Sequence, residues 1–264
     1  MSKVLTYPPG TFCWVDLTTP DIEKARAFYI RLLGWRTRDV PARDNLRYSL
    51  MLKHGYEVAA IVPQPPFLRD SPPMWNSYLC VKDVNEVTDR ARQLGASVLS
   101  EAADVTNQGR MSVITDPGGA RLMLWQPVKH TGAGIINEPG SLAWNELMTQ
   151  DAERATEFYT QLFGWTHRTR KMPDGRSYHL FGNRGRDTAG MLEMSSEMDH
   201  LPTAWMVYFA VAHLDEALDR NDHLGGLKQF GPMTISNTGI LAMISDAVGA
   251  YCYLIQLQQE PAPL

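Results

Sequence analysis

Two carboxylates occupy matched places in this chain, each two residues beyond a tryptophan. Asp16 follows Trp14, and Glu146 follows Trp144. Residues two apart in an extended strand point to the same face, so each carboxylate should share a face with its tryptophan. A carboxyl group among aromatic side chains is desolvated, which raises its pKa and suits it to general acid–base chemistry. Alternatively, each carboxylate accepts hydrogen bonds from a neighbouring Tyr, Trp or Arg and only braces the structure.

This matching belongs to a duplication of the whole chain. Residues 14–35 return at 144–165 with about half of them identical, and the offset of 130 residues persists to Asp116 and Asp246. Such a period is far longer than the ~20–50 residues of solenoids and propellers. We predict a first domain at 1–128, a linker at 129–140 and a second domain at 141–264. The repeat favours the bracing role, because few enzymes need the same group in two places.

Each half contains two units of one strand, one helix and three strands. In the first unit, strand 11–18 precedes an amphipathic helix at 22–33, which Asp21 can begin and Gly34 can end. Strands at 35–40, 46–53 and 58–62 follow. The second unit has a strand at 75–81, a helix at 84–94 and strands near 97–99, 110–115 and 120–125. The second half repeats both units.

Four βαβββ units in two halves resemble the vicinal oxygen chelate superfamily of glyoxalases, bleomycin-resistance proteins and extradiol dioxygenases. The resemblance rests on the segments ARAFYIRLLGW and ATEFYTQLFGW, and on DPGGARLMLWQ and DAVGAYCYLIQ near the end of each half. It implies a duplicated α+β glyoxalase-like fold in which four βαβββ modules form two curved-sheet cups. Fold alone does not establish function.

The resemblance also implies a divalent metal held in a cup by His, Glu or Gln. The positions that would carry these ligands hold Trp14, Asn76 and Met123 in the first half and Trp144, Met206 and Tyr253 in the second. An indole only donates hydrogen bonds, and a thioether is a poor ligand for such ions. Glu193 alone falls near a further ligand position. We therefore expect no dedicated metal site and no cofactor, with weak or non-standard binding near Glu193 left open.

Aromatic side chains should line the cups instead, by strand alternation. A concave face with such a lining and a few polar groups suits a planar or apolar organic ligand. The alternative is that these residues are plain core. The candidate ligand-binding residues are Trp14, Tyr48, Asn76, Tyr78, Met123, Trp125, Trp144, Tyr178, Met206, Tyr208, Tyr251 and Tyr253, with Asp16 and Glu146 as candidate catalytic groups.

Composition excludes several other classes of protein. The net charge is −4 with Lys and Arg scattered, which gives nucleic-acid binding little support. No apolar run approaches the length of a membrane span, so no membrane partner is expected. The three cysteines, Cys13, Cys80 and Cys252, lie in apolar runs typical of buried thiols, which fits a cytoplasmic protein. The expected oligomeric state is a monomer or homodimer.

Three functional hypotheses follow. The first is a small-molecule protein that binds or modifies an aromatic or apolar metabolite or antibiotic in a cup, without a tightly bound metal. The second, implied by the resemblance, is a metal-dependent glyoxalase-type lyase or extradiol-type dioxygenase. The third is a non-catalytic scaffold that has lost its site. An open cup would favour the first hypothesis over the third, and bound metal would favour the second.

Overall fold

The computed structural model describes residues 3–41, 47–65, 71–172, 175–195, 198 and 202–258. Its first half contains β1 (Phe12–Thr19), α1 (Ile22–Leu33), β2 (Arg36–Pro41), β3 (Arg47–Lys53), β4 (Tyr56–Pro63), β5 (Met74–Cys80), α2 (Val84–Gln93), β6 (Ser97–Val105), β7 (Gly109–Thr115) and β8 (Arg121–Pro127). The second half contains β9 (Leu142–Thr149), α3 (Ala152–Phe163), β10 (Thr166–Lys171), β11 (Ser177–Asn183), β12 (Arg186–Glu193), β13 (Ala204–Ala210), α4 (Leu214–His223), β14 (Leu227–Ile235), β15 (Gly239–Ser245) and β16 (Tyr251–Leu257).

Each half forms one eight-stranded sheet. The strand orders are β2-β3-β4-β1-β5-β8-β7-β6 and β10-β11-β12-β9-β13-β16-β15-β14, so every pairing of the first sheet recurs in the second. Matched elements begin 130 residues apart, as β1 at Phe12 and β9 at Leu142 show. The predicted duplicated α+β fold is confirmed. One difference is β6, which runs to Val105 and not only to residue 99.

The helix ends follow from the sequence. The Asp21 side chain accepts a hydrogen bond from the Lys24 backbone N–H at 3.0 Å, and Gly34 ends α1 at a φ of 69°. Asp151 and Gly164 do the same for α3, with a φ of 68° at Gly164. A side-chain acceptor satisfies a free N–H of the first turn, and glycine adopts the left-handed conformation without strain.

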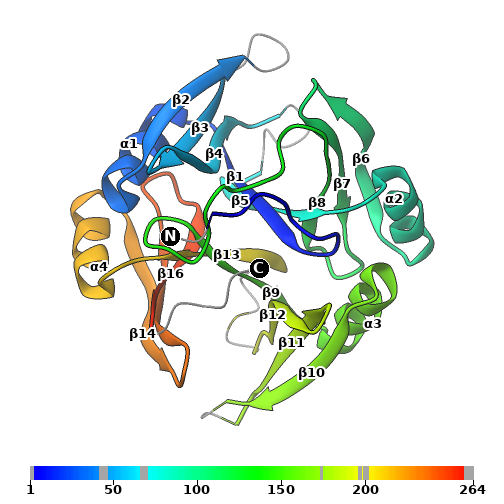
Figure 1. Ribbon diagram of the computed structural model, residues 1–264. Helices are drawn as coiled ribbons and strands as arrows, with labels where there is room; N and C mark the ends of the chain where they lie inside the picture. The colour runs from blue at the N-terminus through cyan, green and yellow to red at the C-terminus, as the bar shows by residue number, and fades with distance from the viewer. Residues whose placement is uncertain are drawn as a thin grey trace.

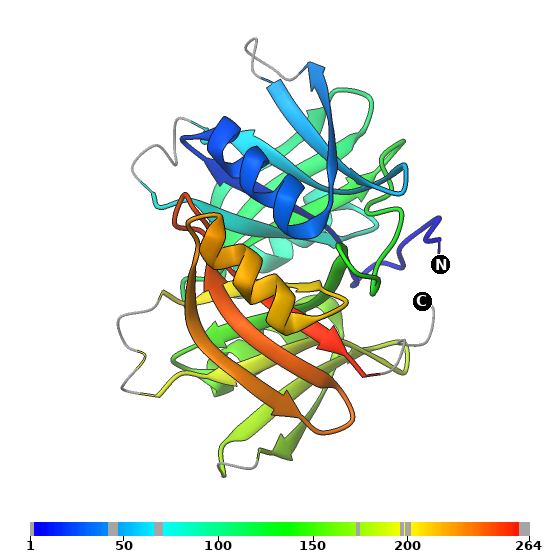
Figure 2. The ribbon, with the colours of Figure 1, turned by 90° about the vertical axis from the view of Figure 1, so that its left-hand side faces the viewer.

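The two halves pack against each other through their helix-bearing faces. In Figure 1, α1 lies beside α4 on one side of the molecule and α2 lies beside α3 on the other, and Figure 2 shows the first pair from outside. Val15 and Leu17 of β1 share one buried cluster with Val207 and Phe209 of β13. The sheets' opposite, concave faces are therefore left for the two cups.

A buried hydrogen-bond chain joins the halves. The Trp205 indole donates to the Tyr159 hydroxyl at 2.8 Å, and that hydroxyl donates to Asp116 of the other half at 2.8 Å. In the matched place, Trp75 donates to Tyr29 at 2.8 Å, and Tyr29 lies within electrostatic reach of Asp246. Asp116 and Asp246 thus have a role at the interface as well as in a turn.

Candidate functional site

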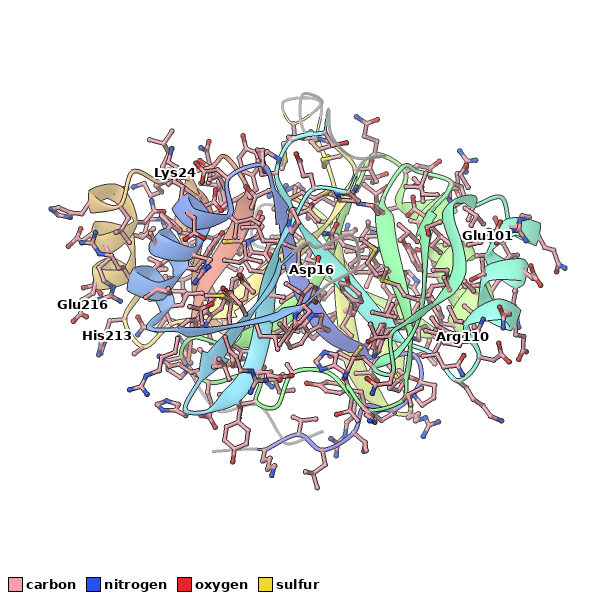
Figure 3. The ribbon with its side chains drawn as sticks, turned by 90° about the horizontal axis from the view of Figure 1, so that it is seen from above. Asp16, Lys24, Glu101, Arg110, His213 and Glu216 are labelled. Carbon is pink, nitrogen blue, oxygen red and sulfur yellow. The ribbon has the colours of Figure 1, made fainter. Side chains whose placement is uncertain are left out.

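Strand register places the candidate residues in two equivalent rows. Asp16 of β1 pairs with Asn76 of β5, and Trp14 pairs with Tyr78. Figure 3 shows Asp16 in the middle of the molecule, whereas Lys24, Glu101 and Glu216 lie at its periphery. Because the pairing repeats in the second sheet, each carboxylate lies beside the same strand positions, and the two cups can be compared residue by residue.

In the first cup, the carboxylate is held by the neighbouring strand. The Tyr78 hydroxyl donates to Asp16 Oδ2 at 2.5 Å, and the Asn76 amide donates to Oδ1 at 2.8 Å. Burial raises the pKa of Asp16, and these hydrogen bonds partly offset the shift. The Trp14 indole donates to the Tyr48 hydroxyl at 3.1 Å. Both oxygens of Asp16 are therefore engaged by the protein itself.

The N-terminal segment and the linker fill the first cup. Tyr7 is 6 % exposed, and its hydroxyl donates to the Ala133 carbonyl at 2.7 Å. The His130 ring lies edge-on to Trp14 at 4.5 Å between centroids, and its backbone carbonyl accepts a hydrogen bond from Trp125 at 2.9 Å. Of the remaining first-cup candidates, Met123 packs in the same buried cluster. Ligand binding by the first-cup residues stays a prediction.

The second cup encloses a cavity of about 1670 Å³. In β9, Trp144 and Glu146 point into it, and their β13 partners are Tyr208 and Met206. Tyr208 stacks on Tyr253 of β16 with the ring centroids 4.3 Å apart. The candidates that line the cavity are Trp144, Glu146, Tyr178, Tyr208, Tyr251 and Tyr253, whereas Met206 packs beside it.

Glu146 lies between phenol groups in the cavity wall. Tyr208 donates to its Oε1 at 2.8 Å, and Tyr178 also hydrogen-bonds the carboxylate. The Trp144 indole in turn donates to the Tyr178 hydroxyl at 3.2 Å. Burial raises the pKa of Glu146, and the two tyrosines and the charges of Arg170 and Arg176 partly offset the shift. A carboxyl group with a raised pKa that faces a cavity is suited to give a proton to a bound ligand and to take one back.

A glycine makes this arrangement possible. Gly190 of β12 pairs with Glu146, and a Cβ there would overlap the Tyr178 hydroxyl and lie 2.8 Å from the Trp144 indole nitrogen. The first cup has Ala60 at the matched position, paired with Asp16. Tyr178 can therefore approach its carboxylate more closely than a side chain over alanine could.

Methionines and cations that were not among the candidate residues complete the cavity. Four methionines line it: Met172, Met198, Met233 and Met243. Thioether side chains are flexible and polarisable, and they adapt to flat ligands of varied shape. Five cations also line it: Arg168, Arg170, Lys171, Arg176 and Arg186. Four of them fall within nine residues of the sequence, on β10 and in the connection before β11, and Arg186 begins β12.

The donor set does not fit a metal of the kind that the fold family uses. Among the described residues, no three His, Cys, Asp or Glu side chains are grouped so that they could hold an ion. Around Glu146 the nearest groups are phenols, an indole and thioethers, which are poor ligands for hard or borderline divalent ions. Glu193 instead accepts a backbone hydrogen bond from Ala152 at 3.4 Å.

The structure bears directly on the expectations for the cysteines and for membrane-spanning segments. Cys13, Cys80 and Cys252 are free and buried, which confirms their prediction as buried thiols. In the described part of the chain, none of the helices combines the length and apolarity needed to cross a membrane.

Comparison with known proteins identifies the family. The Glyoxalase/Bleomycin resistance protein/Dioxygenase superfamily matches residues 11–124 and again 138–250. The chain belongs to this superfamily. CFP32 of Mycobacterium bovis, which carries a provisional glyoxylase name, is 38 % identical over 266 residues, covering 100 % of this chain and 99 % of the relative. The anthracycline biosynthesis protein DauV of Streptomyces sp. strain C5 is 28 % identical, with 96 % and 95 % covered.

Solved structures agree on the fold of this superfamily member. The 2,3-dioxygenase LapB of Pseudomonas sp. KL28 superposes with a TM-score of 0.64 at 15 % identity, covering 100 % of this chain and 97 % of LapB. The Mn(II)-bound glyoxalase of Novosphingobium aromaticivorans gives 0.64 at 13 % identity, with 100 % and 89 % covered. At such identities the likeness concerns the fold alone.

Proposed function

We propose that this protein binds a flat, largely apolar organic molecule in its second cup and that Glu146 transfers protons on it. The observation that carries the proposal is the cavity of about 1670 Å³ with a buried carboxyl group in its wall. Its lining of aromatic and methionine side chains suits fused or substituted rings. The first cup supports the same view by contrast, since Tyr7, His130 and Ala133 occupy it.

Glu146 has the surroundings of a general acid–base group. Its raised pKa brings the carboxyl group closer to neutral pH, where a group can both accept and return a proton. Tyr208 and Tyr178 hold its position by hydrogen bonds. A ketone oxygen beside Glu146 could accept its proton, and the carboxylate could then remove a proton from the carbon next to the carbonyl, which converts the ketone into its enol. This chemistry is an isomerisation or a related proton-transfer reaction.

The relatives are consistent with a flat ligand. Two proteins of about the same length, DauV and the Streptomyces peucetius protein DnrV, are named for anthracycline biosynthesis and are each 28 % identical to this chain. An anthracycline contains a flat system of fused rings. Polycyclic ketones and quinones are therefore suitable first compounds to test, although the identity of the relatives' own ligands does not transfer to this chain.

Calorimetric titration with 2-naphthol and 1,4-naphthoquinone tests the binding proposal. Met233 lines the cavity, whereas Ala103 at the matched place in the first half is exposed. Met233→Trp should fill the cavity and weaken binding about tenfold, because ring contacts are lost to the new side chain. The control Ala103→Trp should bind as the wild type does. Equal binding by both variants, or none by the wild type, would refute the assigned site.

A substrate found in this way then tests the role of Glu146. Glu146→Gln should keep ligand binding but lower turnover by about 10²–10⁴-fold, the usual contribution of general acid–base catalysis. Asp16→Asn changes the matched carboxylate in the filled cup and should leave turnover within about twofold once the variant is shown to be folded. Unchanged turnover in Glu146→Gln would leave a binding protein without the proposed proton transfer.

A further inference from the structure

The second cavity has a cationic wall in addition to its apolar one. Among the described residues, five Arg and Lys side chains line it, together with the carboxylates Asp187 and Glu146. Asp187 is already paired with Arg168 at 2.6 Å. Burial raises the pKa of Glu146 and so disfavours its ionised form. In its neutral form Glu146 does not offset the positive charge of the arginines. The described part of the cavity wall therefore carries more cationic than anionic side chains.

Four of these five cations occupy positions that hold uncharged residues in the first half. The Arg168–Asp187 pair has a counterpart in Arg38 and Glu57, which also form an ion pair. The other four cations have no charged counterpart in the first half. At the positions matched to Arg170, Lys171, Arg176 and Arg186, the first half has the uncharged residues Val40, Pro41, Leu46 and Tyr56. The positive wall thus accompanies the cavity and is absent from these positions in the filled cup.

Two of the cations lie close to the candidate acid–base group. The charges of Arg170 and Arg176 both act on Glu146, and the Arg170 guanidinium lies 5.0 Å from the centroid of the Tyr178 ring. The charge of Arg176 also acts on Tyr253. Met233 and Met243 line the same cavity from β14 and β15, at the other end of the sheet from β10. The cavity therefore combines cations near Glu146 with thioether and aromatic side chains from the other strands, among further polar groups such as Gln229.

We propose that the ligand of the second cup is an aromatic acid whose anionic group binds Arg170 and Arg176 while its ring system packs against the methionines and tyrosines. This inference rests on the proposed function and adds the charge of the ligand to it. A guanidinium presents paired N–H donors that match a carboxylate or phosphate in geometry and charge. The anion would also place the attached ring carbons beside Glu146.

Four probes with one ring system separate charge from shape. 2-Naphthoate and 2-naphthyl phosphate are anionic, 2-naphthamide is neutral and 2-naphthylmethylamine is cationic. Calorimetric titration at about 50 mM salt should rank both anions at least about tenfold tighter than the amide, with the amine weakest, and about 1 M salt should narrow these differences because the charges are then screened. The order of the two anions distinguishes a carboxylate from a phosphate ligand.

Arginine variants locate the anion. Arg170→Gln and Arg176→Gln should each weaken 2-naphthoate about tenfold and leave 2-naphthamide unchanged, since a charge-assisted contact is lost but the apolar wall is not. Arg31→Gln is the matched control: it removes the same charge from an exposed site in the last turn of α1 and should change neither affinity. Unequal losses between the two variants would still support the inference and would show which arginine dominates.

The failures are distinguishable. Equal affinity for naphthoate and naphthamide, or full naphthoate affinity in both arginine variants, would overturn the anionic ligand while leaving the apolar cavity and its proposed function intact. Absence of binding by all four probes would overturn the proposed function as well. Naphthoate binding that survives Met233→Trp without loss would place the anion outside the cavity and would also overturn the inference.

Discussion

The two cups have matched strands but different contents. In the first, Trp14 is 2 % exposed beneath the linker residue His130 and beside the N-terminal segment. In the second, Trp144 is only partly buried and lines a cavity. The position matched to Tyr7 is Asn137, which also lines that cavity. The difference therefore arises in the segments that cross the concave face and in the side chains on it, while the strand framework is unchanged.

The matched carboxylates show what such a difference permits. Asp16 is held by an amide and a phenol from one neighbouring strand, Asn76 and Tyr78. Glu146 is one methylene longer and is held only by phenols, Tyr208 and Tyr178, at the wall of a cavity. A duplicated domain can keep the carboxylate as a brace in one copy and use it for chemistry in the other. The bracing role that the repeat favours for both groups is best supported for Asp16.

The largest expected effect concerns the two tryptophans. Trp14→Ala should lower the free energy of unfolding by about 3–5 kcal/mol, because it leaves a void among fixed neighbours. Trp144 already faces a cavity, so Trp144→Ala should lower the free energy of unfolding by about half as much. Urea denaturation of both variants measures the difference. If the two costs were equal, the first cup would not be the more tightly packed of the two.

Exchanging the residues that face the carboxylates should have a smaller effect. Gly190→Ala should push Tyr178 away from Glu146 and cost about 1–3 kcal/mol, the usual range for overpacking. It should also weaken binding in the second cup. Thermal unfolding and ring-probe titration report the two effects separately.

The reciprocal change is the control. Ala60→Gly removes a methyl group in the filled cup and should not alter ring binding, whatever it costs in stability. An unaffected Gly190→Ala variant would show that the close approach of Tyr178 does not depend on the glycine.

Ionisation of Glu146, the buried carboxyl group in the second cup, should make the free energy of unfolding depend on pH. The pKa of Glu146 is raised above the usual value of 4.5 mainly by burial. A raised folded-state pKa gives stability that is complete below the unfolded pKa and is lost as pH rises through the folded pKa. Glu146→Gln cannot ionise, so its stability relative to the wild type should increase as pH rises above about 4.5. Urea denaturation series between about pH 4 and 9 measure this slope.

Salt distinguishes the two carboxylates in this experiment. The groups that face Glu146 include the exposed Arg170, whose charge salt screens readily. Asp16 is affected instead by Arg121, which is partly buried. Added salt should therefore make the stability difference between Glu146→Gln and the wild type depend more steeply on pH. The corresponding change for Asp16→Asn should be smaller. Equal salt responses would contradict the exposed cationic wall.

The fold was accessible from the sequence because its signals are local and are repeated. Asp21 and Gly34 mark the ends of α1, and alternation along β1 and β9 places Trp14 with Asp16 and Trp144 with Glu146. The repeat then extends one half's assignment to the other. The exception is β6, which continues through residues 100–105 as an edge strand. There Ser, Glu and Asp are mixed with small apolar residues, so no clear apolar alternation marks the strand.

The asymmetry between the cups was not accessible in this way. Tyr7 and His130 fill the first cup from segments without a periodic pattern, and their positions depend on packing between distant parts of the chain. The cationic wall was missed although most of its members lie between residues 168 and 176, because only the pairing of β10, β11 and β12 brings this segment and Arg186 to one cavity. The bond from Tyr159 to Asp116 across the halves likewise needs the packed structure.

The smallest expected effect concerns the contact that holds the linker over the first cup. The His130 Nδ1 lies 3.3 Å from a carboxylate oxygen of Glu57, whose side chain is 30 % exposed. The hydrogen bond from His130 lowers the pKa of Glu57 below its usual value. A lowered folded-state pKa gives stability that is present above the unfolded pKa and is lost as pH falls through the folded pKa. Partial exposure limits this contribution to at most about 1 kcal/mol.

Glu57→Gln should therefore destabilise the protein slightly at neutral pH, and the difference from the wild type should disappear in acid. The second cup supplies the comparison, because Asp187 at the matched position is paired with Arg168, whose side chain is 59 % exposed. Asp187→Asn should change stability by no more than about 0.5 kcal/mol at any pH, since exposed ion pairs contribute little. Urea denaturation at pH 7 and near pH 4 measures both variants. Equal effects would mean that the linker is held over the first cup by apolar packing of His130 against Trp14 and not by its hydrogen bond to Glu57.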